Sequence, residues 1–345
     1  MGLMKVISPG FLSTFQDLGR FGYQKYGMPV AGAMDEYSLR VANLLVGNRE
    51  GEACLEITLL GPSLEFTAES VIALTGADLG AALNGRKLPL WQTIHLHKGD
   101  RLEFGGIKAG CRTYLAVAGG FNIPEVMESK STYMRGKMGG YQGRALKKAD
   151  EVSIPLPSRE ALRRVNSKVP EEYLYNFTGP EPVRVVLGPQ DAAFSKEGIM
   201  TFLNSSYQVT NQADRMGYRL KGPKIEHRSS PDIISDGIAP GAVQVPGEGM
   251  PIIMMADRQT IGGYTKIATI ISADLPKVAQ AKPGDALRFQ AVSLAEARQI
   301  AERFTNTLRL IKDYLLAPGQ LKKVRHLKVK INDKEFFLAV QEIPQ

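Results

Sequence analysis

The sequence has few of the features that define specialised classes of protein. It contains only two cysteines, Cys54 and Cys111, among 345 residues, which are too few for a disulfide framework and too far apart for a Cys-x-x-Cys site. No apolar run approaches the roughly 20 residues that a membrane-spanning helix needs. The first ten residues, MGLMKVISPG, lack the charged start and long apolar core of a signal peptide. We therefore expect a cytoplasmic protein with no membrane partner.

Several motifs of catalysis and nucleotide binding are also missing. The sequence has no Gly-x-x-x-x-Gly-Lys-Ser/Thr loop, no Gly-x-Ser-x-Gly elbow and no His-Glu-x-x-His helix. ATP, if it is used, is therefore not bound here in the Walker manner. His95 and His97 fall on one side of a predicted strand, but no third ligand is evident nearby, so we expect a hydrophilic strand face and no metal site.

The charge of the chain is positive but dispersed. The formal net charge is +8, and lysines and arginines are spread over the whole length. The densest basic run, LKKVRHLKVK at 321–330, has no aromatic stacking platform and no nucleic-acid motif around it. We interpret it as a solvated basic face, or as a surface for an acidic partner, and expect no nucleic acid.

What the sequence does contain is typical of a mainly β fold. With 35 glycines and 20 prolines, turns are frequent, and short apolar or alternating runs recur between them. One exception lies near the N-terminus, where Asp35 can cap a helix that Gly47 ends. The apolar runs are LEITLLG, SLEFT, SVIALTGA, TIHLHKGDRLEF and RTYLAVAGG.

Breaks in these patterns predict the domain boundaries. Residues 1–155 form a first β domain, residues 156–182 a proline-rich linker, residues 183–292 a second β domain and residues 293–345 an extension. In the extension a helix begins at a Ser293/Glu296 capping box and ends before Gly319. A β-hairpin around an Asn-Asp turn follows it.

The two predicted β domains repeat similar segments in the same order. Asp17 opens DLGRFGY in the first half and Asp214 opens DRMGYRL in the second. VIALTGAD and IIMMAD end at Asp78 and Asp257, and GDRLEF recurs as GDALRF. An internal duplication is the economical interpretation.

Polar residues gather beside glycines in these repeated segments. Arginine suits the binding of a carboxylate because its forked donors bond two oxygens at once, and a neighbouring acid can orient it or accept a proton. A structural alternative is that these are turns, or buried ion pairs that join strands. Repetition in both halves favours convergence on a shared cleft. The candidate residues are Gln16, Asp17, Arg20, Asp78, Asp214, Arg215, Arg219, Asp257, Arg258, Gln259, Thr260, Gly262, Gly263 and Tyr264.

The same segments carry a resemblance to a known family. FQDLGRFGYQKYGMPVAGAMDEYSLRVANLLVGN, ALTGADL, RTYLAVAGGFNIPEVMESKSTYMRGKMGG and SDGIAPGAVQVPGEGMPIIMMADRQTIGGYTKIATII resemble the KipI-antagonist family, also described as allophanate hydrolase subunit 2 or the biotin-dependent carboxyltransferase family. The resemblance covers about residues 4 to 290. In the loop SKST, Lys130 stands where the family commonly has arginine, which keeps the charge without the bidentate fork.

The resemblance implies two cyclophilin-like β-barrel domains. It also implies a role as the C subunit of an ATP-dependent 5-oxoprolinase, which opens 5-oxoproline to glutamate together with a KipI-like B subunit and a LamB/YcsF-like A subunit. ATP with Mg would be bound with or by these partners. The alternatives are a non-catalytic antagonist that binds a KipI-like kinase inhibitor, and a biotin-dependent carboxyltransferase of the urea carboxylase type. The sequence shows neither a fused biotin carboxylase nor a Met-Lys-Met biotin site, which favours the oxoprolinase.

Side-chain chemistry suggests a division of roles within the predicted cleft. Asp17 and Asp257 would orient groups or transfer protons, and Arg258 would act with them in catalysis. The remaining predicted substrate-binding residues would contact anionic groups, shape the pocket or admit the ligand. They are Gln16, Arg20, Arg215, Arg219, Thr260, Gly262, Gly263 and Tyr264.

Overall fold

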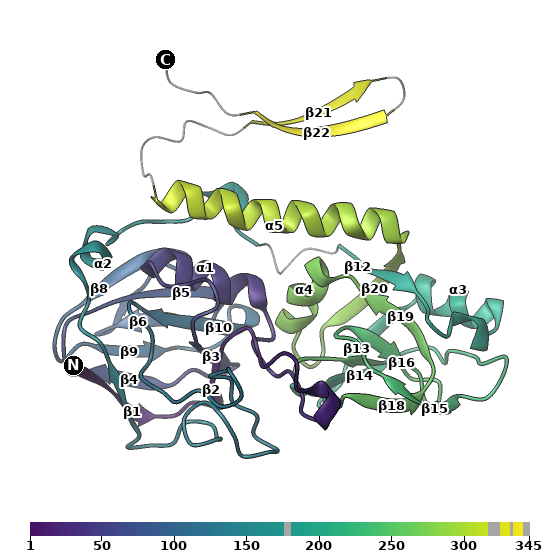
Figure 1. Ribbon diagram of the computed structural model, residues 1–345, viewed down its shortest axis with the longest axis horizontal. Helices are drawn as coiled ribbons and strands as arrows, with labels where there is room; N and C mark the ends of the chain where they lie inside the picture. The colour runs from purple at the N-terminus through teal and green to yellow at the C-terminus, as the bar shows by residue number, and fades with distance from the viewer. Residues whose placement is uncertain (176–180, 317–324, 332–333, 341–345) are drawn as a thin grey trace.

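The chain folds into two mainly β halves with a long helix across them (Figure 1). The structure is a computed structural model that describes residues 1–175, 181–316, 325–331 and 334–340. Among these residues, no helix is long and apolar enough to cross a membrane.

The first half consists of two facing sheets. Apolar side chains from both sheets, such as Met4, Phe66, Leu74 and Leu115, form one core between them. The six-stranded sheet contains, in order, β11 (Glu151–Ile154), β1 (Gly2–Ser8), β4 (Ser63–Phe66), β9 (Arg101–Phe104), β6 (Ala81–Leu83) and β7 (Arg86–Lys87). The five-stranded sheet contains β2 (Leu12–Gln16), β3 (Cys54–Thr58), β10 (Ala109–Val117), β5 (Ser70–Asp78) and β8 (Thr93–Leu96).

The helix of the first half begins and ends where the sequence predicts. Helix α1 (Glu36–Val46) is capped by the Asp35 carboxylate, which accepts from the backbone N–H of Ser38 at 2.9 Å. Gly47 ends it with a φ of 81°, a left-handed conformation that glycine adopts without strain. The helix covers the outer face of the five-stranded sheet, where its residues Leu39 and Leu45 are fully buried.

The second half is a closed barrel. Its interior is lined by apolar side chains such as Val185, Tyr207, Ile253 and Phe289. Around the barrel the order is β12 (Val183–Leu187), β19 (Lys266–Ile270), β16 (Ala242–Gln244), β17 (Ile252–Met254), β14 (Gly217–Lys221), β13 (Ser206–Val209) and β20 (Ala286–Ala291).

Two further strands pair with each other outside the barrel. Strands β15 (Asp232–Gly237) and β18 (Ile261–Tyr264) form an antiparallel two-stranded sheet, here called the ribbon. Shorter helices complete the two halves: η1 (Gln24–Tyr26), α2 (Arg159–Arg163), η2 (Glu171–Tyr173), η3 (Asp191–Ala193), α3 (Lys196–Asn204), η4 (Ser272–Asp274) and α4 (Leu275–Gln280).

A long helix follows the barrel and packs against the first half. Helix α5 (Leu294–Leu316) begins with the predicted capping box, in which the Glu296 carboxylate accepts from the backbone N–H of Ser293 at 2.7 Å. Its buried residues Leu308, Ile311 and Leu315 join the cluster around α1. Strands β21 (Arg325–Ile331) and β22 (Lys334–Val340) then pair as the predicted hairpin.

The predicted fold class is thus confirmed: the protein is mainly β in two halves, with a C-terminal helix and hairpin. Gly319 and the Asn-Asp turn at 332–333 lie outside the described residues, as does part of the linker, 176–180. The exact domain limits stay a prediction.

Candidate functional site

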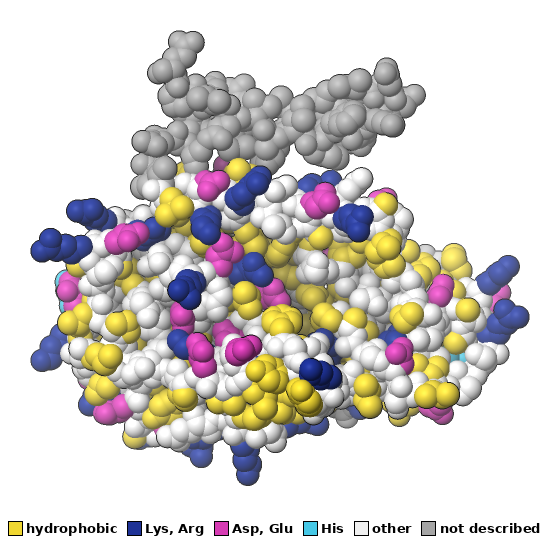
Figure 2. Space-filling model, in the orientation of Figure 1, with side chains coloured by type: hydrophobic (Ala, Val, Ile, Leu, Met, Phe, Trp, Pro, Cys, Tyr) yellow, Lys and Arg dark blue, Asp and Glu magenta, His cyan; other side chains and the backbone are white. Residues whose placement is uncertain are grey.

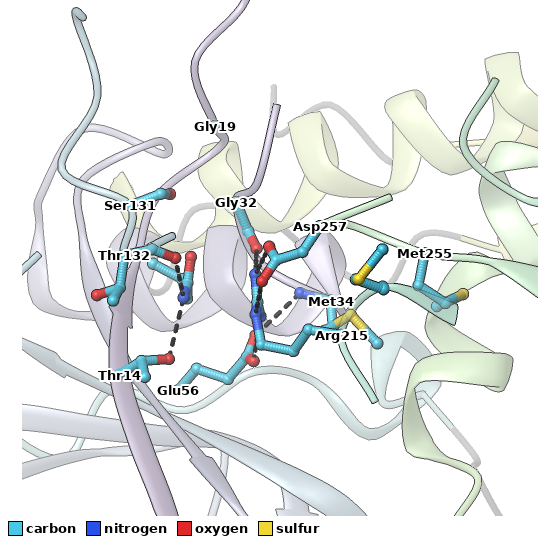
Figure 3. Close-up of polar contacts among 12 residues, drawn as sticks. Thr14, Gly19, Gly32, Met34, Glu56, Ser131, Thr132, Arg215, Met255 and Asp257 are labelled. Carbon is cyan, nitrogen blue, oxygen red and sulfur yellow. Dashed lines mark hydrogen bonds and ion pairs between the residues drawn. The ribbon is translucent and has the colours of Figure 1, made fainter. Parts of the chain in front are cut away.

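A buried ion-pair network joins the two halves of the molecule. Arg215, just before β14, donates to both oxygens of the Asp257 carboxylate, with Nη2 to Oδ1 at 2.9 Å and Nε to Oδ2 at 3.1 Å. The same guanidinium donates to Glu56 on β3 of the first half and to the Gly32 carbonyl. Figure 3 shows Arg215 lying between Asp257 and Glu56. All three charged side chains are less than 10% exposed.

The charges of this network determine the pKa values of its members. Burial raises the pKa of a carboxyl group, yet the pKa of Glu56 is lowered because Arg215 and Arg112 outweigh burial. The pKa of Asp257 is raised, because burial there exceeds the opposing effect of Arg215. Burial lowers the pKa of the Arg215 guanidinium, but the two carboxylates reverse that shift and keep it charged.

Asp17 organises a loop of the first half. Its Oδ1 accepts from the backbone N–H of Gly19 at 2.7 Å and from the Ser129 hydroxyl at 2.8 Å, and also from the Ser131 hydroxyl. Its Oδ2 accepts from the backbone N–H of Lys130 at 2.6 Å. These contacts fix the 129–131 loop against the end of β2. In this arrangement both Asp17 oxygens already serve as acceptors. Lys130 itself points to Glu52, with Nζ to Oε1 at 2.6 Å.

Arg20 is fully buried and has donors without acceptors. Its Nη2 donates to the Ser131 carbonyl, while Nε and Nη1 have no hydrogen-bond partner among the described residues. Burial lowers the pKa of Arg20, and the nearby carboxylates of Asp17 and Asp257 partly oppose this. Unsatisfied buried donors on a cation are costly, so this guanidinium is suited to binding an anion.

Gln16 provides a hydrogen-bond acceptor beside the same loop, where Arg20 provides donors. Its amide nitrogen donates to Thr14 Oγ1 at 2.9 Å and to the Thr132 carbonyl at 3.2 Å. Its Oε1 is buried and has no partner among the described residues. Arg20 and Gln16, which bond to the successive carbonyls of Ser131 and Thr132, therefore provide donors and an acceptor without partners among the described residues.

Arg258 is a further buried cation, located between the barrel and the ribbon. It donates from Nε to the Ile238 carbonyl at 2.9 Å and from Nη1 to the Met255 carbonyl at 3.3 Å. No carboxylate in the described part of the chain pairs with it. Burial lowers its pKa to about 10.

The residues after Arg258 build the ribbon. Thr260 accepts through its carbonyl from the backbone N–H of Ile238 at 3.0 Å. Gly262 faces Gln244, because a Cβ on Gly262 would lie 2.9 Å from the Gln244 amide nitrogen. Gly263 and Tyr264 end β18, where Tyr264 is exposed.

Other predicted residues lie away from the network. Arg219 is exposed on β14 and lines a separate cavity of about 380 Å³ with Glu248 and Met250. Asp78 ends β5 and accepts from the N–H of Gly80, and Asp214 accepts in the same way from Met216, so both stabilise turns. Gln259 is exposed.

A larger cavity contains none of the predicted residues. It has a volume of about 880 Å³ and lies between the two halves beneath α5. The side chains that line it include Lys108, Arg184, Lys277, Arg288 and Phe304.

Sequence reasoning missed two buried charged residues, Glu56 of the ion-pair network and Lys266 of the barrel. Glu56 lies in CLEIT and Lys266 in KIATI, strands that are otherwise almost entirely buried. A charged residue within an otherwise apolar strand segment could have identified each of them, because a buried charge needs a partner.

Comparison with known proteins places this architecture in a family. The model of the carboxyltransferase domain, subdomain A and B, matches residues 26–291. The chain belongs to this carboxyltransferase-domain family. It is 38% identical over 309 residues to the C subunit of 5-oxoprolinase from Escherichia coli strain K12, which covers 89% of this chain and 97% of that protein. It is 33% identical to the corresponding C subunit of 5-oxoprolinase from Haemophilus influenzae, over 87% of this chain and 96% of that one.

Solved structures show the same carboxyltransferase architecture. The crystal structure of Kluyveromyces lactis urea carboxylase superposes with a TM-score of 0.84 at 31% identity. The match covers 99% of this chain and 32% of that enzyme, so this family member corresponds to about a third of the larger protein. The predicted family membership is confirmed.

Proposed function

We propose that this chain is the C subunit of an ATP-dependent 5-oxoprolinase, which hydrolyses 5-oxoproline to L-glutamate. Support comes from the similarity to the E. coli protein over 97% of its length. Further support comes from Arg20, a fully buried guanidinium that the Asp257 carboxylate of the second half influences and that has two nitrogens without a partner among the described residues.

The groups around Arg20 match the chemistry of the substrate. 5-Oxoproline has a carboxylate and a lactam whose carbonyl oxygen gains negative charge when water attacks. Arg20 would bind one of these oxygens, since preorganised donors stabilise developing charge most strongly in a buried site. Gln16 Oε1 would accept the lactam N–H. Asp257 and Arg215 would hold the second half in place, and Asp17 would keep the 129–131 loop in position.

ATP with Mg²⁺ would be bound with or by the partner subunits of the proposed complex. Mg²⁺ with ATP takes oxygen ligands, often one or two carboxylates together with the phosphates. The described residues contain no group of three or more His, Cys, Asp or Glu side chains that could hold a metal ion. The proposed partners are one KipI-like and one LamB/YcsF-like subunit.

A hydrophobic patch next to Arg20 supports the docking of such a partner. Phe21 and Tyr26, on the loop that contains η1, are 62% and 73% exposed. Figure 2 shows hydrophobic side chains gathered over the η1 region of this face. Exposed apolar patches of this kind mark interaction surfaces.

Reconstitution tests the proposal. 5-Oxoproline-dependent ATP hydrolysis and glutamate release would be measured with this chain alone, with the KipI-like partner, and with both partners. We expect turnover only in the complete mixture. Tight pairing without turnover in any mixture would instead identify a protein that antagonises a KipI-like regulator.

Biotin-dependent carboxyl transfer is the second candidate. The likeness to K. lactis urea carboxylase favours it. This function predicts that transfer of labelled carboxylate to urea requires a biotinylated carrier and stops when avidin is added. A complete oxoprolinase mixture that is insensitive to avidin would argue against it.

A further inference from the structure

The outer face of the barrel under the ribbon carries polar groups that the proposed site does not use. Gln244 on β16 is paired in register with Ile252 on β17 and with Lys266 on β19. Residues paired directly across antiparallel strands lie on the same face of the sheet. Their neighbours Val243 and Ile253 belong to the barrel interior, so Gln244 and Lys266 face outward.

Lys266 is a buried ammonium with an exposed counter-ion. Its side chain is 3% exposed, whereas its partner Asp236, on the ribbon, is 58% exposed. Nζ lies 2.9 Å from Asp236 Oδ2 and 3.3 Å from the Gly237 carbonyl. The charge of Lys266 is thus compensated by the Asp236 carboxylate. Asp236 lies on β15, which in the described part of the chain pairs with β18 alone.

Gln244 adds a donor that lacks an acceptor. Its amide nitrogen is buried and has no hydrogen-bond partner among the described residues. Gly262 of the ribbon lies directly against this nitrogen and leaves no room for a Cβ. The adjacent Ile238 carbonyl is bound by Arg258, so a second buried cation flanks the same segment and adds positive potential.

We propose that this face is a binding site for a small carboxylate or phosphate anion, and that Asp236 occupies it in the absence of ligand. Lys266 and Gln244 supply the donors, and the ribbon closes over them. An arriving anion replaces the Asp236 carboxylate on Lys266 and gives the Gln244 amide its missing acceptor. The expectation that 5-oxoproline is one such anion rests on the proposed function, but the site itself rests on the geometry alone.

Direct binding to the full chain tests this site. Affinities for 5-oxoproline and for inorganic phosphate would be measured by calorimetry, with potassium chloride of equal ionic strength as the reference. Lys266→Met and Gln244→Leu should each weaken binding at least about tenfold, since each removes a hydrogen bond to a charged group. Asp236→Asn should tighten binding, because the internal competitor is neutralised. The exposed Lys282, which pairs with Asp285, provides a matched control as Lys282→Met.

A second variant covers the case in which Lys266→Met does not fold. Gly262→Ala leaves both members of the Lys266–Asp236 pair in the chain but places a methyl group 2.9 Å from the Gln244 amide nitrogen, where the anion would bind, so it should also weaken binding. Binding of either anion supports the site if these variants weaken it. The anion that binds more tightly shows whether the site prefers a carboxylate or a phosphate. The proposal is overturned if neither anion binds beyond chloride, or if Lys266→Met and Gly262→Ala bind as the unmodified chain does. Because binding is measured without partners, absent turnover in the reconstituted complex would reject the oxoprolinase and leave this result standing.

Discussion

At the scale of single residues, Arg20 is unusual because its placement costs stability. A fully buried guanidinium with one hydrogen bond to the described residues loses its hydration without full compensation. Such strain is found where function requires it. Gly139 contributes to the arrangement, because a Cβ there would lie 2.7 Å from Arg20 Nη2.

Replacing Arg20 should separate activity from stability. Arg20→Met should lower kcat/KM for 5-oxoproline in the complete complex by about 100-fold, the loss typical of one stabilising donor group. Its melting temperature should not fall, since apolar replacement of a poorly paired buried charge is often neutral or favourable. Arg101→Met, at an exposed pair with Glu65, is the control and should change neither quantity. Unchanged kinetics for Arg20→Met would remove Arg20 from the site.

Glu56 predicts a dependence of stability on pH. Its folded pKa is lowered from 4.5, so the folded state binds fewer protons than the unfolded state. Its stabilisation is therefore present above pH 4.5 and is lost as the pH falls through the folded pKa. Glu56→Gln should lower the free energy of unfolding by about 3 kcal/mol at pH 7, because Arg215 loses a buried partner.

Urea denaturation from pH 7 to pH 3.5 measures both effects. The unfolding free energy of Glu56→Gln should fall less steeply below pH 4.5 than that of the unmodified chain. Glu65→Gln, at an exposed pair, should keep the original slope. Equal slopes for Glu56→Gln and the unmodified chain would contradict the assignment.

At the scale of elements, the Gln280 side-chain amide joins α4 of the second half to β10 of the first half. Gln280 accepts at Oε1 from the backbone N–H groups of Cys111 and Arg112, at 3.0 and 2.9 Å. Its nitrogen donates to the Asp35 carboxylate at 2.8 Å. One side chain therefore connects α4, β10 and the cap of α1.

Removing that amide should weaken the contact between the halves. Gln280→Leu leaves two buried N–H groups without acceptors and should cost about 3 kcal/mol of unfolding free energy. Chemical denaturation followed by tryptophan fluorescence would measure it, since Trp91 is the only tryptophan. Gln208→Leu, an exposed glutamine, should leave the midpoint in place. A midpoint for Gln280→Leu that matches the unmodified chain would show that the interface does not need this group.

The elements that sequence predicts well are those whose signals are local. The Asp35 cap, Gly47 and the Ser293/Glu296 box act over three or four residues, and each lies where expected. The ribbon was not predicted, because IGGY and DIISDG do not alternate clearly and they pair residues that are 24 or more positions apart. Long-range pairing of this kind depends on the whole fold.

At the scale of the whole molecule, the sequence identified several residues of the candidate site but not which of them contact one another. Asp257 and Arg215 were identified by the duplication, and they do meet. Glu56, which joins them, belongs to the other half and is 159 positions from Arg215. Arg219 lies on the exposed face of β14, opposite its buried neighbours Tyr218 and Leu220, whereas Arg215 precedes that strand.

The patch over η1 leads to a prediction about assembly. Tyr26→Asp places a charge on an exposed apolar surface, so it should leave the fold intact and weaken binding of the KipI-like partner at least about tenfold. Phe11→Asp, equally exposed at the β1–β2 turn, is the control. Analytical ultracentrifugation of the mixtures would measure the complex. Full assembly by Tyr26→Asp would exclude η1 from the partner surface.

The Glu56–Arg215–Asp257 contact also bears on how the gene can be divided. If residues 1–175 and 181–316 were made from separate plasmids, the first fragment would keep Glu56 and Arg112 but lose Arg215. The second would keep Arg215 with Asp257 but lose the Glu56 and Gly32 acceptors. Reassembly of the fragments would depend on their concentrations, as in any association of separate chains. Fragment complementation in cells would then report on this contact without any assay of catalysis.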